Sequence, residues 1–196
     1  MKQMEMDVRA LLARIDALGA EKARVIVAID GGAGSGKTTL AAQIAEETGA
    51  DCLHMDDFFL QPHQRTAERL AEPGGNVDYA RFEAEVLAPL CCGEAYIYRR
   101  FSCAEQRLLP GEKKAPARIT VVEGSYSLHP RLARYYDLKV LLRIDADEQS
   151  ARILAREGEE KHARFMREWI PLENLYFDKT DIAARCDMIL RAGGHA

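Results

Sequence analysis

The sequence predicts an α/β protein with a doubly wound, mainly parallel sheet that carries helices on both faces. Apolar runs typical of buried parallel strands alternate with segments of helical periodicity along most of the chain. A glycine-rich stretch, GGAGSGKTT at residues 31–39, follows the first of these runs and leads into a helix. The length of 196 residues matches one domain, so we expect residues 1–196 to fold as a single domain.

The expected strands are short, apolar and rich in β-branched residues. They span residues 24–30, 51–55, 118–124, 138–144 and 186–190. A helix is expected at residues 1–20, where apolar side chains recur at helical spacing, and a second one runs from the glycine-rich stretch to Gly49. A long charged helix should follow the fourth strand, because Asp145 and Glu148 have capping-box spacing there. An interruption of that helix is expected at Gly158.

Residues 61–118 form the irregular part of the chain, where prolines and glycines interrupt any regular pattern. A helical stretch is expected near residues 79–90, and PGEKKAP at residues 110–116 should be a loop because two prolines flank a charged run. A short helix is expected near residues 130–135, before the fourth strand.

Composition and charge disfavour several classes of function. The net charge of −4 does not indicate a nucleic-acid or anionic-membrane partner, and no apolar run approaches the roughly 18 residues of a membrane helix. The first ten residues, MKQMEMDVRA, lack the apolar core of a signal peptide. The five cysteines form no C-x-x-C pair, which disfavours a zinc site and favours reduced thiols. We therefore expect a cytoplasmic protein that binds neither nucleic acid nor membranes.

The glycine-rich stretch fits G-x-x-x-x-G-K-[ST], the pattern of a phosphate-binding loop. Such a loop wraps backbone N–H groups around a phosphate, and glycines permit both the torsions and the close approach. Lys37 is expected to bridge the β- and γ-phosphates, and the Thr38 hydroxyl to bind Mg²⁺. The predicted nucleotide-binding residues are Gly31, Gly32, Ala33, Gly34, Ser35, Gly36, Lys37, Thr38 and Thr39.

A phosphate-binding loop occurs in switch GTPases, motor ATPases and small-molecule kinases, and other motifs separate these classes. The nearest match to the guanine-reading motif N/T-K-x-D is DKTD at residues 178–181, which has the wrong first residue and precedes an expected strand. No D-x-x-G switch follows the third strand, and 196 residues leave little room for motor elements. A small-molecule kinase therefore fits best, with ATP or GTP left open as the donor.

Three later stretches resemble one family of kinases. They are DDFF at residues 56–59, the strand end Glu123–Gly124, and YYDLKVLLRIDAD at residues 135–147 with Arg152 and Arg156 after it. With the phosphate-binding loop, they make the chain similar to the uridine kinase and phosphoribulokinase family of P-loop kinases over about residues 24–191.

The resemblance implies a P-loop NTPase fold with a five-stranded sheet, an acceptor-binding insertion at residues 61–118 and a helical lid at residues 148–170. It also implies ATP and Mg²⁺ as cofactors and transfer of the γ-phosphoryl group to a hydroxyl of a small molecule. Related kinases are often oligomers, so a homo-oligomer is compatible with the resemblance.

The catalytic residues implied by the resemblance also satisfy an independent physical argument. Ligands of open α/β sheets bind at the carboxyl ends of the strands, where the phosphate-binding loop, Asp56 and Glu123 all lie. Arg152 and Arg156 share one helical face and suit a transferring phosphoryl group. The predicted catalytic residues are Lys37, Asp56, Arg152 and Arg156, with Asp56 as the base, and the predicted Mg²⁺ ligands are Thr38, Asp56 and Glu123. The alternative for Asp56 and for the two arginines is a solvated position, and the alternative for Glu123 is a structural capping role. Asp57 is expected behind the site or in solvent.

The acceptor site is where the chain departs most from the family pattern. NVDY at residues 76–79 keeps the family's Asn and Asp but lacks its His and Pro, and Cys103 stands where a base-reading His is expected. Asp78, Tyr98 and Arg100 are the predicted substrate-binding residues. Arg99 and Arg100 would favour an anionic acceptor if either points inward, and solvent-facing positions are the alternative.

The most consistent acceptor is a nucleoside similar to uridine or cytidine. Pantothenate, a sugar, a sugar phosphate or another riboside remain alternatives, as does a nucleotide-binding ATPase or regulatory module without any acceptor.

Overall fold

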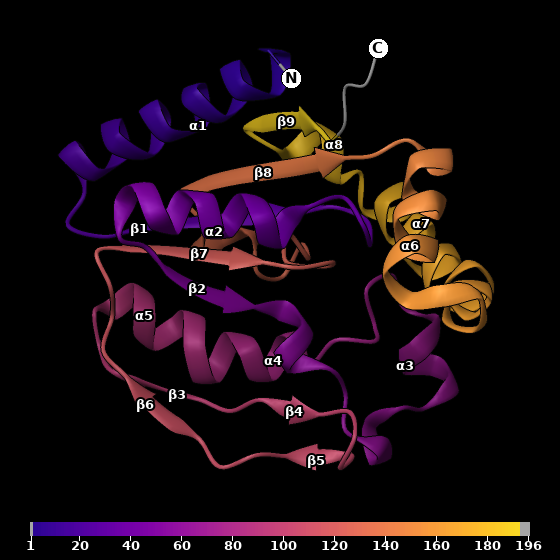
Figure 1. Ribbon diagram of the computed structural model, residues 1–196. Coiled ribbons are helices and arrows are strands. Elements are labelled where there is room, and N and C mark those ends of the chain that lie inside the picture. Colours follow the sequence, from indigo (N-terminus) through magenta and orange to yellow (C-terminus); the bar gives the residue numbers. More distant parts are fainter. Residues whose placement is uncertain (1, 193–196) are drawn as a thin grey trace.

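The computed structural model describes the backbone of residues 2–192 and the side chains from residue 7 onward; Met1 and residues 193–196 lie outside the described part. Its centre is a five-stranded sheet in which every neighbouring pair is parallel. The strands, in spatial order, are β2 (Asp51–His54), β7 (Ile119–Glu123), β1 (Val25–Asp30), β8 (Leu138–Arg143) and β9 (Met188–Arg191). This arrangement confirms the predicted doubly wound α/β fold and its five strands (Figure 1).

Helices cover both faces of the sheet because alternate side chains of the strands point to opposite faces. Along β1, Val25, Val27 and Ile29 pack with α1 (Lys2–Glu21) and α2 (Lys37–Thr48). The intervening Ile26 and Ala28 pack in the core on the other face. The helices of that second face are α4 (Tyr79–Phe82), α5 (Ala88–Cys92), α7 (Ile170–Thr180) and α8 (Ile182–Arg185).

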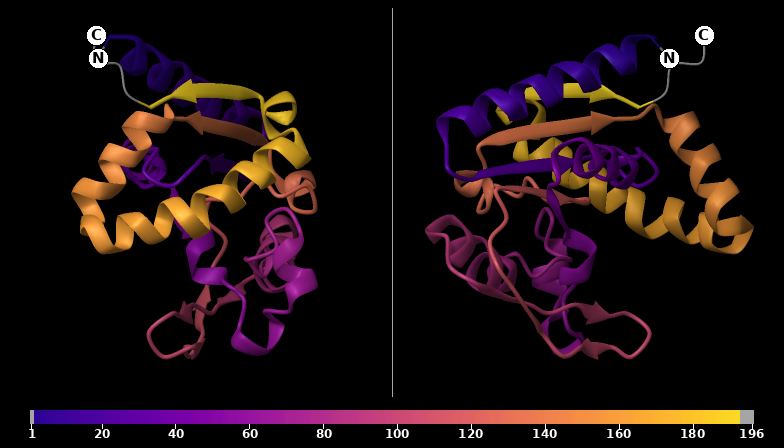
Figure 2. Two further views of the ribbon diagram at one scale, coloured as in Figure 1. Left: turned by 90° about the vertical axis from the view of Figure 1, so that its right-hand side faces the viewer. Right: turned by 60° about the vertical axis from the view of Figure 1, so that its left-hand side comes forward.

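The segment between β2 and β7 holds small elements that lie at the end of the molecule away from α1 (Figures 1 and 2). Its helical elements are η1 (Met55–Phe58), η2 (Pro62–Gln64), α3 (Ala67–Ala71), α4, the π-helical η3 (Glu83–Leu87) and α5. Two short antiparallel pairs follow: β3 (Tyr96–Tyr98) with β6 (Glu112–Lys114), and β4 (Phe101–Ser102) with β5 (Arg107–Leu108). The helical stretch near residues 79–90 is thus confirmed, and the role of this segment in acceptor binding stays a prediction.

The expectation of a loop throughout residues 110–116 is wrong at its centre, where β6 pairs with β3. Lys113 lies opposite Ile97 in this ladder. Lysines are common on short edge strands because their charge discourages pairing with other chains. The charged run therefore did not exclude a strand here. The second strand also ends at His54, two residues before Asp56, and η1 continues from there.

The long helix after β8 bends twice before it returns to the sheet. α6 (Ala146–Arg164) is kinked at Gly158, whose φ of 78° and ψ of 172° are not helical. A π-helical stretch, η5 (Phe165–Trp169), then leads into α7. Figure 2 shows that this path carries the chain away from the strand ends and back again. The interruption at Gly158 is confirmed, but the capping box is not formed: Asp145 makes no side-chain cap bond and Glu148 pairs with Arg152 at 2.6 Å.

Within residues 2–192, no helix is both long enough and apolar enough to cross a membrane. The short helix expected near residues 130–135 corresponds to η4 (Ala133–Tyr135).

A partly buried histidine ties the loop after β7 to α4 and should make stability depend on pH. The ring of His129 stacks on Tyr79 at a centroid distance of 4.1 Å. Burial lowers the pKa of His129 to about 4, and the positive charges of Arg69 and Arg131 lower it too. An unfolded histidine has a pKa of about 6.5, so between pH 6.5 and 4 the unfolded chain binds more protons than the folded one. The free energy of unfolding should therefore fall by up to about 2 kcal/mol between pH 7 and pH 5 through this group.

Urea unfolding at both pH values tests this. His129→Phe keeps a stacked ring but cannot titrate, so the loss of stability between pH 7 and pH 5 should be smaller in that variant. His63→Gln removes an exposed histidine and serves as the control. An equal pH dependence in wild type and His129→Phe would contradict the assignment.

Candidate functional site

The carboxyl ends of β1, β2 and β7 open into a cleft of about 1000 Å³. The cleft continues between the phosphate-binding loop and the α6–η5–α7 stretch, which lies beside the strand arrowheads in Figure 1. All six of the predicted catalytic and Mg²⁺-binding residues line it together: Lys37, Thr38, Asp56, Glu123, Arg152 and Arg156. Groups separated by more than 100 residues in the sequence therefore converge on one cavity.

The phosphate-binding loop has the geometry that its glycines suggested. A Cβ at Gly31 would collide with the backbone oxygen of Leu142, and Gly36 precedes α2 with a φ of 95°, in the left-handed region. Lys37 is buried, and its Nζ donates to the backbone oxygen of Gly32 at 2.9 Å. The hydroxyl of Ser35 is buried without a hydrogen-bond partner among the described residues. The glycine cradle, the buried ammonium and the N-terminus of α2 fit a phosphate chain.

A carboxylate that sequence reasoning missed holds this loop in place. Glu173 of α7 accepts hydrogen bonds from the backbone N–H of Ala33, at 2.9 Å and 3.1 Å to its two oxygens. It also accepts one from the Ser125 hydroxyl at 2.8 Å. Burial raises the pKa of Glu173, while the bond from Ala33 and the charge of Lys37 oppose that shift. No local pattern around residue 173 signals this role, because the contact spans 140 positions of sequence.

A second buried carboxylate, that of Asp30, anchors the phosphate-binding loop to neighbouring elements. Asp30, the last residue of β1, accepts bonds from the Tyr176 hydroxyl at 2.7 Å and from the backbone N–H groups of Gly31, Tyr126 and Leu128 at 2.7–3.1 Å. Burial raises the pKa of Asp30, and the bonds from Tyr176 and the backbone lower it. This carboxylate fixes the loop after β1, the loop after β7 and α7 relative to one another.

Oxygen ligands gather where β2 and β7 end. The Thr38 hydroxyl donates to Glu123 at 3.2 Å, and His54 Nδ1 lies 2.6 Å from the same carboxylate oxygen. His54 is the register partner of Glu123 on the neighbouring strand, and this bond raises the pKa of His54. A hydroxyl and one or two carboxylates suit Mg²⁺, which takes its other ligands from phosphate and water, so Thr38, Glu123 and Asp56 fit that metal. Within the described chain, no cluster of three or more His, Cys, Asp or Glu side chains could hold a metal without such additional ligands.

The adjacent residues Asp56 and Asp57 have different surroundings. Asp56 in η1 faces the cleft, and its outer atoms reach solvent there. Burial of the rest of the side chain raises the pKa of Asp56; Lys37 opposes the shift, and Glu123 and Asp57 add to it. Asp57 instead accepts a hydrogen bond of 2.7 Å from the Tyr98 hydroxyl. Only Asp56 is therefore placed to meet a ligand in the cleft.

The two predicted arginines of α6 both line the cleft, but they differ in their contacts and exposure. Arg152 donates to the backbone oxygen of Gly34 at 3.2 Å and pairs with Glu148, so it contacts the phosphate-binding loop directly. Arg156 is more exposed and pairs with Glu157 at 2.9 Å. Arg164 and Arg65 also line the cleft. Arg65 was missed because nothing in its sequence surroundings distinguishes it from a solvated side chain.

The predicted substrate-binding residues Asp78, Tyr98 and Arg100 do not line the cleft. Asp78 is buried as the N-cap of α4, where one oxygen accepts from the Arg81 N–H and the other from the Gln64 amide at 2.8 Å. Tyr98 is buried on Asp57, and burial raises the pKa of its hydroxyl. Arg100 is exposed. Asp78 and Tyr98 therefore support the wall from behind.

Arg99 does not point inward either, because it pairs with Glu85 outside the cleft. The part of the cleft opposite the phosphate-binding loop is lined instead by Phe59 and Trp169, whose rings lie 6.1 Å apart, and by Asn76, Cys103 and Arg65. Phe58 belongs to the core, where its ring contacts Phe82 at 4.7 Å. The two neighbouring phenylalanines thus divide between core and cleft.

Comparisons with known proteins find relatives along most of the chain. No protein-family model matches the chain. A uridine kinase of Clostridium perfringens is 28% identical over 193 residues, which covers 89% of this chain and 90% of the relative. A second uridine kinase, from another strain of that species, is 27% identical over 192 residues, with the same coverage.

Solved structures share the fold over nearly the whole chain. A candidate fructose transport system kinase from Silicibacter has a TM-score of 0.69 at 22% identity and covers 93% of this chain and 98% of its own. A candidate uridine kinase from Bacillus stearothermophilus has a TM-score of 0.65 at 19% identity, with 92% and 99% covered. In sequence the chain is therefore similar to uridine kinases over nearly its whole length, and it shares the P-loop kinase fold of these solved structures.

Proposed function

We propose that the chain transfers the γ-phosphoryl group of ATP to a hydroxyl of a small molecule, and that this acceptor is a nucleoside similar to uridine or cytidine. The observation that carries the proposal is the convergence of the phosphate-binding loop, the Thr38–Glu123 pair and Asp56 on one cleft. Each group supplies a different requirement of phosphoryl transfer: a phosphate cradle, a metal site and a carboxylate for the acceptor hydroxyl.

In the proposed reaction, Lys37 and the N-terminus of α2 bind the phosphates of the donor. Asp56 orients the acceptor hydroxyl toward the γ-phosphorus and takes its proton as the new P–O bond forms. The bond between the γ-phosphorus and the β–γ bridging oxygen breaks in the same transfer, and ADP leaves. Arg152 and Arg156 bind the phosphoryl oxygens and stabilise the negative charge that spreads over them. Thr38, Glu123 and Asp56 would hold Mg²⁺, which when bound neutralises charge on the phosphates.

The nucleoside acceptor is supported by the similarity to proteins that are named uridine kinases and by the aromatic wall of the cleft. Phe59 and Trp169 offer apolar ring surface on which a flat base would pack. Asn76, also on the wall, carries an amide group that would donate to an acceptor oxygen.

Arg65 favours a second candidate, an acceptor with a carboxylate or phosphate group. Its Nε donates to the backbone oxygen of Leu60 at 3.0 Å, and its guanidinium lies 5.5 Å from the ring centroid of Phe101. No carboxylate of the described chain forms an ion pair with it, in contrast to Arg99. An unpaired guanidinium on a cleft wall suits an anionic acceptor, so a sugar phosphate or a carboxylic acid is the alternative class.

A coupled ADP-release assay with ATP and Mg²⁺ tests both candidates. The acceptors are uridine, cytidine, other ribosides, pantothenate, and free and phosphorylated sugars. Stimulation by uridine or cytidine is the expected result. Stimulation by anionic acceptors alone would replace the nucleoside with the second class, and ATP turnover that no acceptor changes would overturn the kinase in favour of an ATPase module.

The two acceptor classes also predict different effects of Arg65→Gln. For an anionic acceptor, the KM of that acceptor should rise by about tenfold or more, because a charge-assisted contact is lost. For a nucleoside, the KM should change little. Arg100→Gln is the matched control, since Arg100 is exposed and does not line the cleft.

A further inference from the structure

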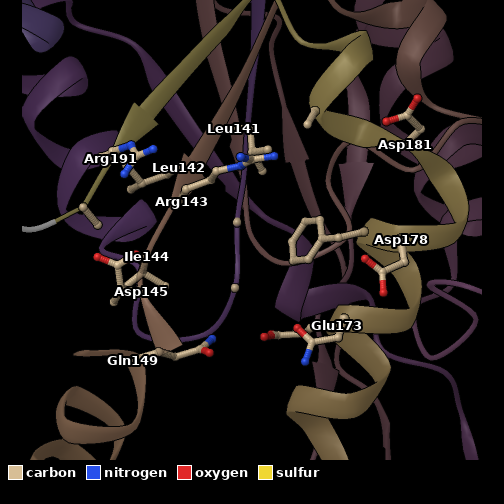
Figure 3. A pocket seen from close by; sticks show the side chains of 16 residues that line it. Leu141, Leu142, Arg143, Ile144, Asp145, Gln149, Glu173, Asp178, Asp181 and Arg191 are labelled. Carbon is tan, nitrogen blue, oxygen red and sulfur yellow. The ribbon is translucent and has the colours of Figure 1, made fainter. Parts of the chain in front are cut away.

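A second cavity, of about 590 Å³, lies between the ends of β8 and β9 and the helix α7. Figure 3 shows its walls: the strand ends on one side, α7 on the other, and the start of the phosphate-binding loop between them. Of its lining residues, Glu173 is the one that also lines the cleft described above. The proposed reaction makes no use of this second cavity.

Two unpaired arginines occupy the strand side of the cavity. Arg143 is the last residue of β8 and Arg191 the last residue of β9, and they are register partners on adjacent parallel strands. Both are exposed, and neither guanidinium group takes part in a hydrogen bond or ion pair within the described chain. Like charges directly opposite each other on neighbouring strands destabilise a sheet. An anion bound between the two guanidinium groups would remove that repulsion and gain charge-assisted hydrogen bonds.

The opposite wall has complementary chemistry. Phe177 of α7 lines the cavity. Asp178 and Asp181 carry carboxylates at the same side, as Figure 3 shows. These two carboxylates take part in no ion pair within the part of the chain that the structure describes. The cavity therefore has an anion-binding end at Arg143 and Arg191 and an end that accepts hydrogen bonds from hydroxyl or amino groups.

Contacts connect this cavity to the phosphate-binding loop. Gln149, on the cavity wall, donates to the backbone oxygen of Ala33 at 2.9 Å. Glu173, on the same wall, accepts from the backbone N–H of Ala33. A ligand that displaces either side chain would alter the hold on Ala33, two residues before Ser35 in the loop.

We propose that the second cavity binds a small ligand that carries a phosphate or carboxylate group, held by Arg143 and Arg191, with hydroxyl or amino groups directed to Asp178 and Asp181. The site is separate from the cleft that holds the donor and acceptor. Bound ligand acts on the phosphate-binding loop through Gln149 and Glu173, which makes this a regulatory site.

Calorimetric titration tests the site with two probes, inorganic phosphate and malonate, which separate a phosphate ligand from a carboxylate ligand. Wild type is first saturated with Mg²⁺ and a non-hydrolysable ATP analogue, so that the phosphate-binding loop is filled. At least one probe should then bind, and Arg143→Gln and Arg191→Gln should each weaken it by about tenfold or more. Arg185→Gln is the control, because Arg185 is an exposed arginine of α8 that lines neither cavity.

Three results would overturn the proposal. The first is that neither probe binds to wild type, and the second is that the probe binds equally to all three arginine variants. The third is displacement of the probe by the ATP analogue, which would mean that the donor nucleotide occupies this cavity or that the probe binds in the phosphate-binding loop. The probes are also titrated into Lys37→Met without the analogue, which keeps the test independent of the proposed function. The arginine substitutions must still lower the affinity for the probe, even if the analogue does not bind.

Discussion

Replacing Lys37 with alanine should abolish phosphoryl transfer and weaken nucleotide binding, the largest effect expected of any single substitution in this chain. Lys37 is 8% exposed and opens α2, with its Nζ on the backbone oxygen of Gly32. Its ammonium is placed where the charge of the β- and γ-phosphates would collect. Loss of one positioned charge of this kind lowers turnover by about 10²–10³-fold or more. Because the same charge binds the ground-state phosphates, affinity for the nucleotide should fall as well.

Acceptor-dependent ADP release and a fluorescence titration with a labelled nucleotide measure the two effects separately. Lys37→Met keeps an apolar stem of similar length without the charge and should behave like the alanine variant, which separates loss of charge from loss of packing. Lys179→Ala is the control, since Lys179 is an exposed lysine of α7. Retained turnover in both Lys37 variants would contradict nucleotide binding by this loop.

Replacing Asp56 with asparagine should reduce turnover strongly while nucleotide binding survives. The carboxylate faces the cleft at the end of β2, and its removal takes away the group that orients the acceptor and accepts its proton. General-base contributions of this kind are about 10²–10⁴-fold, so a loss in that range is expected. The KM for ATP should change little, because Lys37 and the backbone of the loop carry the phosphate contacts.

The pH dependence gives a second readout for Asp56. Burial raises the pKa of this carboxyl, with Glu123 and Asp57 adding to the shift, so its deprotonation occurs above the usual range of an aspartate. A base acts when deprotonated, so turnover should rise with pH through this raised pKa. Asparagine cannot titrate, so the residual activity of Asp56→Asn should lack that rise.

The neighbouring Asp57 provides the matched control for Asp56. Asp57→Asn keeps an oxygen that accepts from the Tyr98 hydroxyl, so it should retain most of the activity. The opposite pattern, a strong loss in Asp57→Asn and near-normal turnover in Asp56→Asn, would assign the base to Asp57. Equal turnover in both variants and wild type would remove the base from this pair altogether.

Much of the fold and the donor half of the site could be predicted from the sequence. β1 and β7 are apolar runs whose side chains are buried on both faces of the sheet. Such a run can be recognised from consecutive residues alone. The phosphate-binding loop is equally local, because its function rests on backbone torsions that glycine allows and on the helix that begins at Lys37. The positions of Asp56 and Glu123, each after an apolar run, predict that both lie at one edge of the sheet.

The acceptor half could not be predicted, because the direction of each side chain there depends on distant packing. Asp78 and Tyr98 stand at positions that match the family pattern, yet one caps α4 and the other bonds to Asp57 behind the wall. The anionic preference assigned to Arg99 and Arg100 loses its basis, since Arg99 is paired with Glu85. In the segment between β2 and β7, Arg65 is the arginine that lines the cleft.

The sequence alone therefore determined the elements whose cause is local: the parallel strands, the phosphate-binding loop and the kink at Gly158. Tertiary structure decided the contacts between distant elements. His54 meets Glu123 because β2 and β7 are neighbours in register, Glu173 reaches Ala33 because α7 returns along the strand ends, and Arg143 lies beside Arg191 because β8 pairs with β9. Hydrophobic periodicity records which face of an element is buried, but not which polar group another element brings to it.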